Sequence, residues 1–152
     1  MRTSPSVLIA ASLALPCAAP AYDPAALEHF GLFRECKGCD LSGVDLSYET
    51  LKNVDLTGAN LSNATLKAAD FYSAILVDVD LRGADLTEAN LNSAVLRGAD
   101  LRGATLYNAK LLGTNLTDAD LGGAIKLGEI AVSEAVLCRT QLDGGVEERD
   151  CK

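Results

Sequence analysis

Hydrophobic residues recur in this chain at a period of five. Leu or Phe occupies every fifth position from Leu41 to Leu121, which makes seventeen positions without a gap. The position two residues earlier is mostly small, and it is Ala at eleven of the seventeen, between Ala59 and Ala119. A helix would repeat its apolar residues about every 3.6 positions and a strand every 2. The period therefore predicts neither a regular helix nor a long regular strand.

Such a short period predicts a stacked, repetitive architecture. In each five-residue unit, for example 84–88, two residues point inward and three point outward. One unit is too short to bury its own apolar face, so successive turns of chain must stack and share a continuous core. The last outward position is often Gly, as in Gly58 and Gly83. Because Gly tolerates the backbone angles of a corner, we expect the chain to bend there.

These units resemble the pentapeptide-repeat family, whose repeat reads roughly A-(D/N)-L-x-x. The segment 56–121 fits that repeat closely. The resemblance implies an all-β fold, a right-handed quadrilateral β-helix with one unit on each side. Residues one turn apart would then stack about 4.8 Å from each other, the usual spacing between strands.

The repeat loses its register after Leu121, because Lys126 would be the next core position. One extra residue near Gly122 and Gly123 restores the pattern. Ile125 and Leu127 would then face the core, and the same holds further on for a series of later pairs. These pairs are Ile130 and Val132, Ala135 and Leu137, and Thr140 and Leu142. We therefore predict a solenoid over residues 36–144, followed by a C-terminal tail over 145–152.

The N-terminal residues predict export. Arg2 precedes a short apolar run over 7–15, and residues 19–21 form an A-x-A-like site, so we expect a signal peptide over 1–21. Cleavage would fall between Ala21 and Tyr22, and the apolar run is too short to span a bilayer. The mature chain would be periplasmic or secreted.

A short capping helix is expected over residues 22–35. Asp23 suits the N-cap position and Pro24 the first turn of a helix. An uncapped solenoid end would expose both its core and unpaired strand edges, so this helix is expected to cover the first turn. The single histidine, His29, lies here and is interpreted as a solvent-facing residue of the cap.

Charge limits the classes of partner. Removal of Arg2 leaves twelve basic residues against twenty-one acidic ones, a net charge of −9. This charge opposes nucleic acid and anionic membranes as partners. No H-E-x-x-H, G-x-S-x-G or phosphate-loop motif is present, so no enzyme activity, cofactor or metal is expected. The sequence predicts a non-enzymatic periplasmic binding or scaffold module with an unidentified protein partner.

One alternative function follows from the family resemblance. Some acidic members resemble a DNA duplex in shape and charge and bind type II topoisomerases. The acidity of this chain fits such a DNA mimic. The predicted export signal opposes the role, and Arg82, Arg97 and Arg102 interrupt the negative charge.

Four cysteines survive the predicted cleavage, namely Cys36, Cys39, Cys138 and Cys151. An even number in an exported chain favours disulfides. A shared zinc site would need all four thiolates around one metal, whereas a solenoid separates the two pairs. Haem attachment would need a histidine where Asp40 stands. A thiol–disulfide redox role for Cys36 and Cys39 stays open, although the βαβ pattern that usually accompanies it is absent.

The family resemblance extends to both ends of the repeats. Residues 36–43 resemble the N-terminal start of exported members, and residues 137–151 resemble their C-terminal closure. This resemblance implies two structural disulfides. Cys36 would pair with Cys39 at the first turn, and Cys138 with Cys151 over the last one.

The outward positions contain three unusual features. Ile75 and Val95 occupy a position that is elsewhere mostly Asp, Asn or Thr, and with Val77 they form a candidate interface. A second column contains Asp80 and Asp100 beside Arg82 and Arg102, which should offset the repulsion between the stacked carboxylates. Glu49 fills a small inward slot, where it either escapes to solvent or is a buried carboxyl with a raised pKa.

Overall fold

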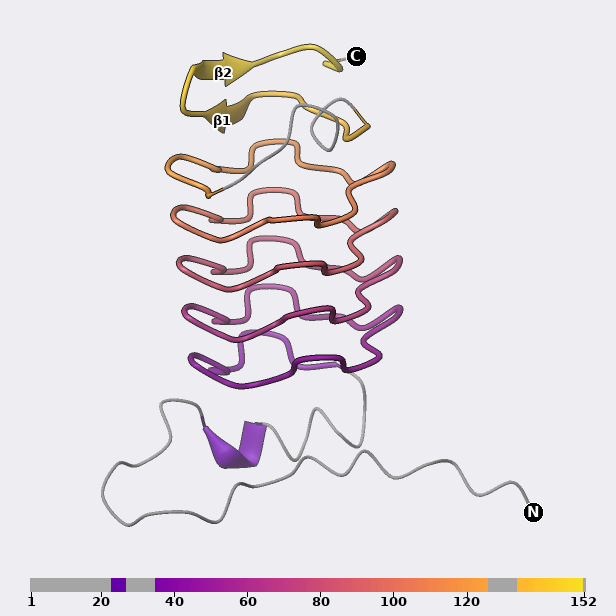
Figure 1. Ribbon diagram of the computed structural model, residues 1–152, viewed down its shortest axis with the longest axis vertical. Helices are drawn as coiled ribbons and strands as arrows, with labels where there is room; N and C mark the ends of the chain where they lie inside the picture. The colour runs from indigo at the N-terminus through magenta and orange to yellow at the C-terminus, as the bar shows by residue number, and fades with distance from the viewer. Residues whose placement is uncertain (1–22, 27–34, 126–133, 152) are drawn as a thin grey trace, which may run out of the picture.

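The chain winds into a four-sided β-helix, shown by a computed structural model that describes residues 23–26, 35–125 and 134–151 (Figure 1). Parallel bridges join residues one turn apart, such as Asp40 with Asn60 and Asn60 with Asp80. Four five-residue units therefore make one turn of the solenoid. The turns stack into a rod, and a hairpin closes its C-terminal end (Figure 1).

The leucine columns form the core. All seventeen Leu and Phe positions are buried, and the most exposed of them, Leu51, is only 5% exposed. The Ala slots beside them are buried as well, so each turn contributes eight inward side chains in the regular part of the rod. Burying one Leu contributes about 1.5–3 kcal/mol relative to leaving it exposed. The period of five thus arises because each side of the rod supplies two core residues.

Each corner is a tight turn closed by a backbone hydrogen bond. At the corner of Gly58, the Ala59 N–H donates to the Leu56 carbonyl oxygen at 3.0 Å. The residue before the closing amide has a positive φ, 68° at Gly58 and 62° at Glu88. A positive φ at this position is typical of a type II turn and explains the frequent glycines. Non-glycine residues also adopt it, and Tyr48 does so with φ 64°.

The N-terminal end is described only in part. Residues 24–26 have helical backbone, and the Asp23 Oδ1 accepts a hydrogen bond from the Ala25 N–H at 2.9 Å, as an N-cap residue would. The Asp23 N–H donates to the Asp40 carbonyl oxygen at 3.0 Å, which joins this segment to the first turn. Residues 27–34 of the expected capping helix, including His29, and the expected signal peptide lie outside the described residues, whereas Glu35 is described and bridges Asp55 in the solenoid.

The expected position of the extra residue was wrong. Ile125 still bridges Thr105 at the regular spacing, whereas Val136 bridges Asn115 with one additional residue. The insertion therefore lies after Ile125 and not near Gly122 and Gly123. Ile125, which was expected to face the core, is 50% exposed. The regular register continues through this unit, so that Ala124 takes the inward position and packs partly buried against the core.

The regular inward pattern resumes beyond the insertion. Ala135, Leu137 and Thr140 are buried as expected, and Leu142 packs partly buried against the core. The Thr140 hydroxyl donates to the Leu116 carbonyl oxygen at 2.8 Å, so this buried polar group is satisfied. The expected core residues between 126 and 133 lie outside the described residues.

A hairpin ends the solenoid. β1 (Thr140–Leu142) pairs antiparallel with β2 (Gly145–Glu147), and Gln141 lies opposite Val146. β1 also continues the helical stack, because Gln141 bridges Asp120 in the turn below. The expected boundary between solenoid and tail, after Gly144, falls in the turn of this hairpin.

Candidate functional site

Asp and Asn side chains brace the corners of the solenoid. The residue before a core Leu is often Asp or Asn, and its Oδ1 accepts a hydrogen bond from the N–H two residues further on. At Asp80 this bond joins the Arg82 N–H at 3.0 Å, and at Asp85 the Thr87 N–H at 3.1 Å. The same bond forms at Asp40, Asp45, Asp55, Asn60, Asp70, Asn90, Asp100, Asn115 and Asp120. The recurring acids are thereby explained as structural supports of the turns.

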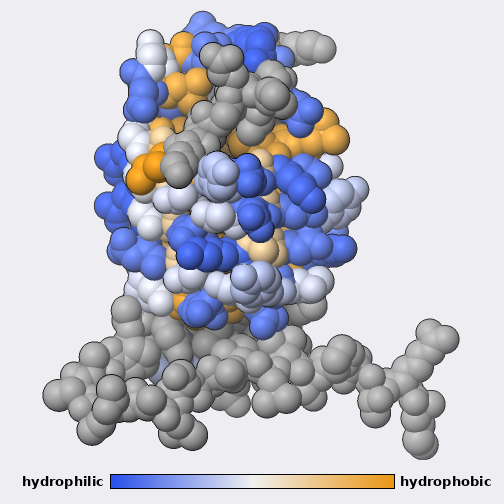
Figure 2. All heavy atoms as spheres, in the orientation of Figure 1, coloured by the Kyte–Doolittle hydropathy of each residue, from blue (hydrophilic) through white to orange (hydrophobic). Residues whose placement is uncertain are grey.

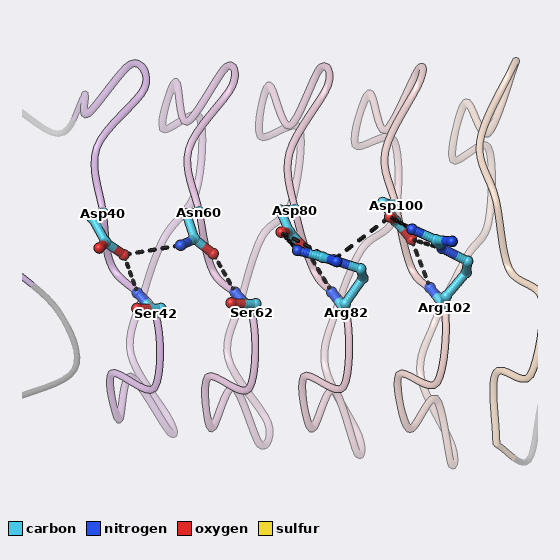
Figure 3. Close-up of polar contacts among 8 residues, drawn as sticks. All are labelled: Asp40, Ser42, Asn60, Ser62, Asp80, Arg82, Asp100 and Arg102. Atoms are coloured by element: carbon cyan, nitrogen blue, oxygen red, sulfur yellow. Dashed lines mark hydrogen bonds and ion pairs between the residues drawn. The ribbon is translucent and has the colours of Figure 1, made fainter.

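One column of acids is interleaved with arginines (Figure 3). Arg82 Nη2 lies 2.6 Å from Asp80 Oδ2, and its Nε lies 3.7 Å from Asp100 Oδ2 in the next turn. Arg102 Nη2 likewise lies 2.6 Å from Asp100 Oδ2. Hydrogen bonds from the arginine two residues on hold the pKa of Asp80 and of Asp100 below the ordinary value. The expected offset of stacked carboxylates by arginines is therefore present.

Three lysines make a similar link between turns, which the sequence reasoning did not find. Lys37 pairs with Asp55 at 2.9 Å, and the other two pairs have the same spacing along the chain. They are Lys52 with Asp70 at 3.0 Å and Lys67 with Asp85 at 3.3 Å. Each lysine stands at a corner, and its partner follows it along the chain by two residues fewer than one full turn of the solenoid. That spacing is a usable signal once the length of the turn is known.

These pairs distribute positive charge over the acidic sides of the rod. On the face drawn in Figure 2, hydrophilic side chains dominate and hydrophobic ones appear as separate spots. An exposed pair contributes only about 0–1 kcal/mol to stability. A DNA duplex presents regularly spaced negative charge instead. The interleaved cations therefore do not favour a duplex mimic.

We expect stability to fall in acid. The pKa values of Asp80, Asp85 and Asp100 are lowered from the ordinary value of 3.8 in the folded chain. Their stabilisation is fully present above the unfolded value and is lost as pH falls through the lower folded values. Thermal unfolding by circular dichroism should show a plateau above about pH 5 and a declining melting temperature below about pH 4. A melting temperature that stays constant down to pH 2 would contradict this expectation.

One side of the rod differs from the others. Its outward residues are Glu35, Asp55, Ile75, Val95, Asn115 and Val136, joined in this order by parallel bridges. Ile75 is 41% exposed and Val136 is 38% exposed. Val77 stands at the corner that follows Ile75 and is partly buried. The three residues expected to form an interface therefore do lie together, with Ile75 directly beside Val95.

The structure adds three residues to this surface. Tyr72 and Leu112 stand at the corner that leads into the same side and are 45% and 57% exposed, and Val136 lies on the side itself. Tyr72 and Leu112 each precede an outward residue of this side by three positions, a relation that only the turn geometry makes meaningful. The regular spacing does not assign Val136 to this column, because the insertion places it 21 residues after Asn115. Together these residues form the apolar face, which comprises Tyr72, Ile75, Val77, Val95, Leu112 and Val136.

Two corners beside the apolar face lack the hydrogen bond that an Asp or Asn side chain makes at other corners. Ile75 and Val95 have no side-chain oxygen, so they cannot accept the corner amide as Asp80 does. Within the described ranges, no acceptor is found for the N–H of Val77 or of Arg97. Each forgone hydrogen bond is worth about 0.5–1.5 kcal/mol. The needs of the fold alone therefore favour Asp or Asn at both positions.

The four cysteines lie in two pairs at opposite ends of the described rod. The Sγ atoms are at disulfide-bonding distance, 1.95 Å between Cys36 and Cys39 and 2.02 Å between Cys138 and Cys151. No group of residues in the described part of the chain is arranged to hold a metal ion. Cys36 is only 1% exposed, and its Sγ lies 3.4 Å from the Ala26 carbonyl oxygen. A redox cysteine must be accessible, so this burial opposes a redox role.

Glu49 lies in its inward slot but is only partly buried. Val44 and Val54, in the neighbouring slots, are 2% and 0% exposed. The contrast agrees with the interpretation that the first turn lets this carboxyl reach solvent.

Comparison with known proteins relates the chain to repeat solenoids. The model of the family "Pentapeptide repeats" matches residues 35–71, 50–88 and 84–123. The crystal structure of Rfr23, a pentapeptide repeat protein from the cyanobacterium Cyanothece 51142, is 32% identical over 82% of this chain and 97% of its own, with a TM-score of 0.50. The protein alr5209 from Nostoc PCC 7120 is 28% identical over 78% of this chain and 93% of its own, with a TM-score of 0.60.

A more distant likeness concerns the fold alone. QnrB1, a plasmid-mediated fluoroquinolone resistance protein, is 20% identical over 72% of this chain and 58% of its own, with a TM-score of 0.52. Among curated protein sequences, none matches this chain.

Proposed function

The chain belongs to the pentapeptide-repeat family, and from that premise we propose that it is an exported, non-enzymatic binding module that docks a protein on its apolar face. The family fold is a right-handed β-helix, and its members are generally structural or binding proteins rather than enzymes. The observation that carries the proposal is the pair of corner hydrogen bonds given up at Ile75 and Val95. Clustered exposed apolar side chains that cost stability are explained if they serve contact with another protein.

Export rests on separate observations. Residues 1–21 have the sequence features of a signal peptide. The cysteine pairs at disulfide-bonding distance suit an oxidising compartment such as the periplasm. Within the residues that the structure describes, no helix has the length and hydrophobicity needed to cross a membrane.

The arrangement of acids supports a binding role over a catalytic one. Asp55 accepts the Thr57 N–H and pairs with Lys37, and Asp70 accepts the Tyr72 N–H. Burial alone would raise the pKa of Asp55, but the hydrogen bonds from Thr57 and Lys37 outweigh it, so the pKa is lowered. A carboxylate with a lowered pKa is a weak general base. These acids therefore serve the structure of the corners.

Affinity capture tests the docking surface. We expect a tagged wild-type chain to recover a specific protein from periplasmic extract and Ile75→Asn/Val95→Asn to lose it. The matched control is Thr65→Asn/Thr105→Asn, which alters the same outward position on the opposite side of the rod and should capture normally. Equal capture by all three proteins would overturn the assignment of the surface. Recovery of the full-length chain from the cytoplasm alone, uncleaved, would overturn export.

A further inference from the structure

We propose that the apolar face binds a second copy of this chain. This inference rests on the proposed function and names the partner that the face takes. The two rods would pack side by side with their axes antiparallel, related by a two-fold axis midway between the turns of Ile75 and Val95. Each copy would then place Ile75 against Val95 of the other. The same patch serves both copies, as an isologous interface requires.

Two exposed charges on the corner beside this face select the antiparallel arrangement. Asp78 and Arg97 stand one turn apart, and both are exposed. Within the described part of the chain, neither makes an ion pair, whereas the neighbouring Asp118 is already bound by Arg139. The proposed axis places the turn of Ile75 in one copy against the turn of Val95 in the other, and the same corner of both copies meets. Arg97 of each copy therefore faces Asp78 of the other, and two ion pairs form across the interface.

Other registers of the antiparallel pair bring like charges together. An axis level with Val95 would place Arg97 opposite Arg97 and Asp78 opposite Asp118. An axis level with Ile75 would place Asp78 opposite Asp78. Like charges facing each other at an interface are unfavourable and suppress wrong pairings. An axis between the turns of Val95 and Asn115 would also avoid these contacts, because Arg97 would face Asp118 and Asp78 would face Arg139. Asp118 and Arg139 already pair with each other within one copy, however, and that axis would leave the turns of Glu35 and Asp55 uncovered.

A parallel pair is also less favourable. An axis along the rods would set Asp55 opposite Asp55, and Arg97 would face the corner of Asn92 instead of an acid. The antiparallel register instead sets Asp55 opposite Asn115. It also overlaps the two rods along their whole described length, because the turn of Glu35 in each copy faces the turn of Val136 in the other. The register with the largest overlap is thus also one that pairs opposite charges, and it does so with two residues that have no ion-pair partner in their own copy within the described part of the chain.

The remaining sides explain why assembly would stop at two. The column after this side carries Asp80, Asp100 and Asp120, whose charge Arg82 and Arg102 offset only in part, and the chain as a whole has a net charge of −8. A closed two-fold pair buries the apolar face of both copies and leaves the acidic sides in solvent, where their mutual repulsion opposes further stacking. A single flat side is small for an interface, so we expect a reversible dimer that dissociates in the micromolar range.

Sedimentation velocity of the purified chain over a micromolar concentration series tests the dimer. We expect the apparent mass to double with rising concentration for the wild type and for Thr65→Asn/Thr105→Asn. Ile75→Asn/Val95→Asn should stay monomeric while its melting temperature is unchanged or higher, because Asn can accept the corner amide that Ile and Val cannot. A folded, monomeric variant of this kind separates loss of docking from loss of folding.

A charge exchange tests the register. Arg97→Asp and Asp78→Arg should each weaken the dimer at least tenfold, and the double variant Arg97→Asp/Asp78→Arg should restore it. Restoration supports the antiparallel pairing, since only that register makes these two residues face each other. Failure of the double variant to restore a dimer that both single changes weaken would overturn the register.

Two results would overturn the second copy as the partner. One is a wild-type chain that stays monomeric at every concentration, and the other is a dimer that Ile75→Asn/Val95→Asn leaves intact. If the chain is monomeric and a different protein is captured through the apolar face, the docking function stands and this inference fails. If neither self-association nor capture depends on the face, both fail.

Discussion

Leu86→Ala should lower the free energy of unfolding by about 3 kcal/mol. Leu86 is fully buried, and Leu66 and Leu106, one turn below and one turn above, are buried with it. The turns directly below and above are closely packed in the same way, so they cannot collapse into the space left by the removed isopropyl group. Because nearest-neighbour contacts carry the stability of a solenoid, loss at a central turn weakens the contacts on both sides.

Chemical denaturation followed by circular dichroism measures this loss. Leu112→Ala is the matched control, because Leu112 is 57% exposed and its truncation should change stability by less than about 0.5 kcal/mol. If the two variants lost equal stability, the leucine columns would not be the source of the stability of the rod. The Leu112 variant would also report on the apolar face, since it removes exposed apolar surface there without a change of charge.

Cys138→Ser/Cys151→Ser should destabilise the chain by about 3 kcal/mol, the loop-closure value for a separation of 13 residues. In the part of the chain that the structure describes, no further turn of the solenoid covers the turn of Leu137. The tail takes over this role, because Asp150 Oδ2 accepts the Leu137 N–H at 2.9 Å and the Asp150 N–H donates to the Leu137 carbonyl oxygen at 2.9 Å. Cys151 holds Asp150 in that place.

Hydrogen exchange should locate the effect. We expect faster exchange of the Leu137 amide and of the β1 amides in the variant, while amides near Leu86 keep their protection. Cys36→Ser/Cys39→Ser is the comparison, with a separation of only 3 residues and hence a smaller entropic contribution. Uniform loss of protection along the rod would contradict a local closing role for the C-terminal pair. Free thiols in the purified wild type would contradict disulfide formation altogether.

Much of the fold could be predicted because a repeat of fixed length imposes its own geometry. Once each turn comprises four units, the partners of Asp80 and the stack of leucines follow from residue number alone. The neighbourhood of Ile75 and Val95 could be predicted for the same reason. The insertion could not be located, because Ala124 and Ile125 satisfy the old register and the new one equally well at the level of hydrophobic pattern.

The sequence by itself determined the period of five, the core residues from Leu41 to Leu121 and the column in which Ile75 meets Val95. It could do so because burial depends on spacing along the chain, and the spacing is constant from Leu41 to Leu121. Only the tertiary structure decided which corner residues border that column, how Lys37 reaches Asp55 and which amides stay without an acceptor. Those relations depend on how the chain turns at each corner and how far a side chain reaches into the next turn.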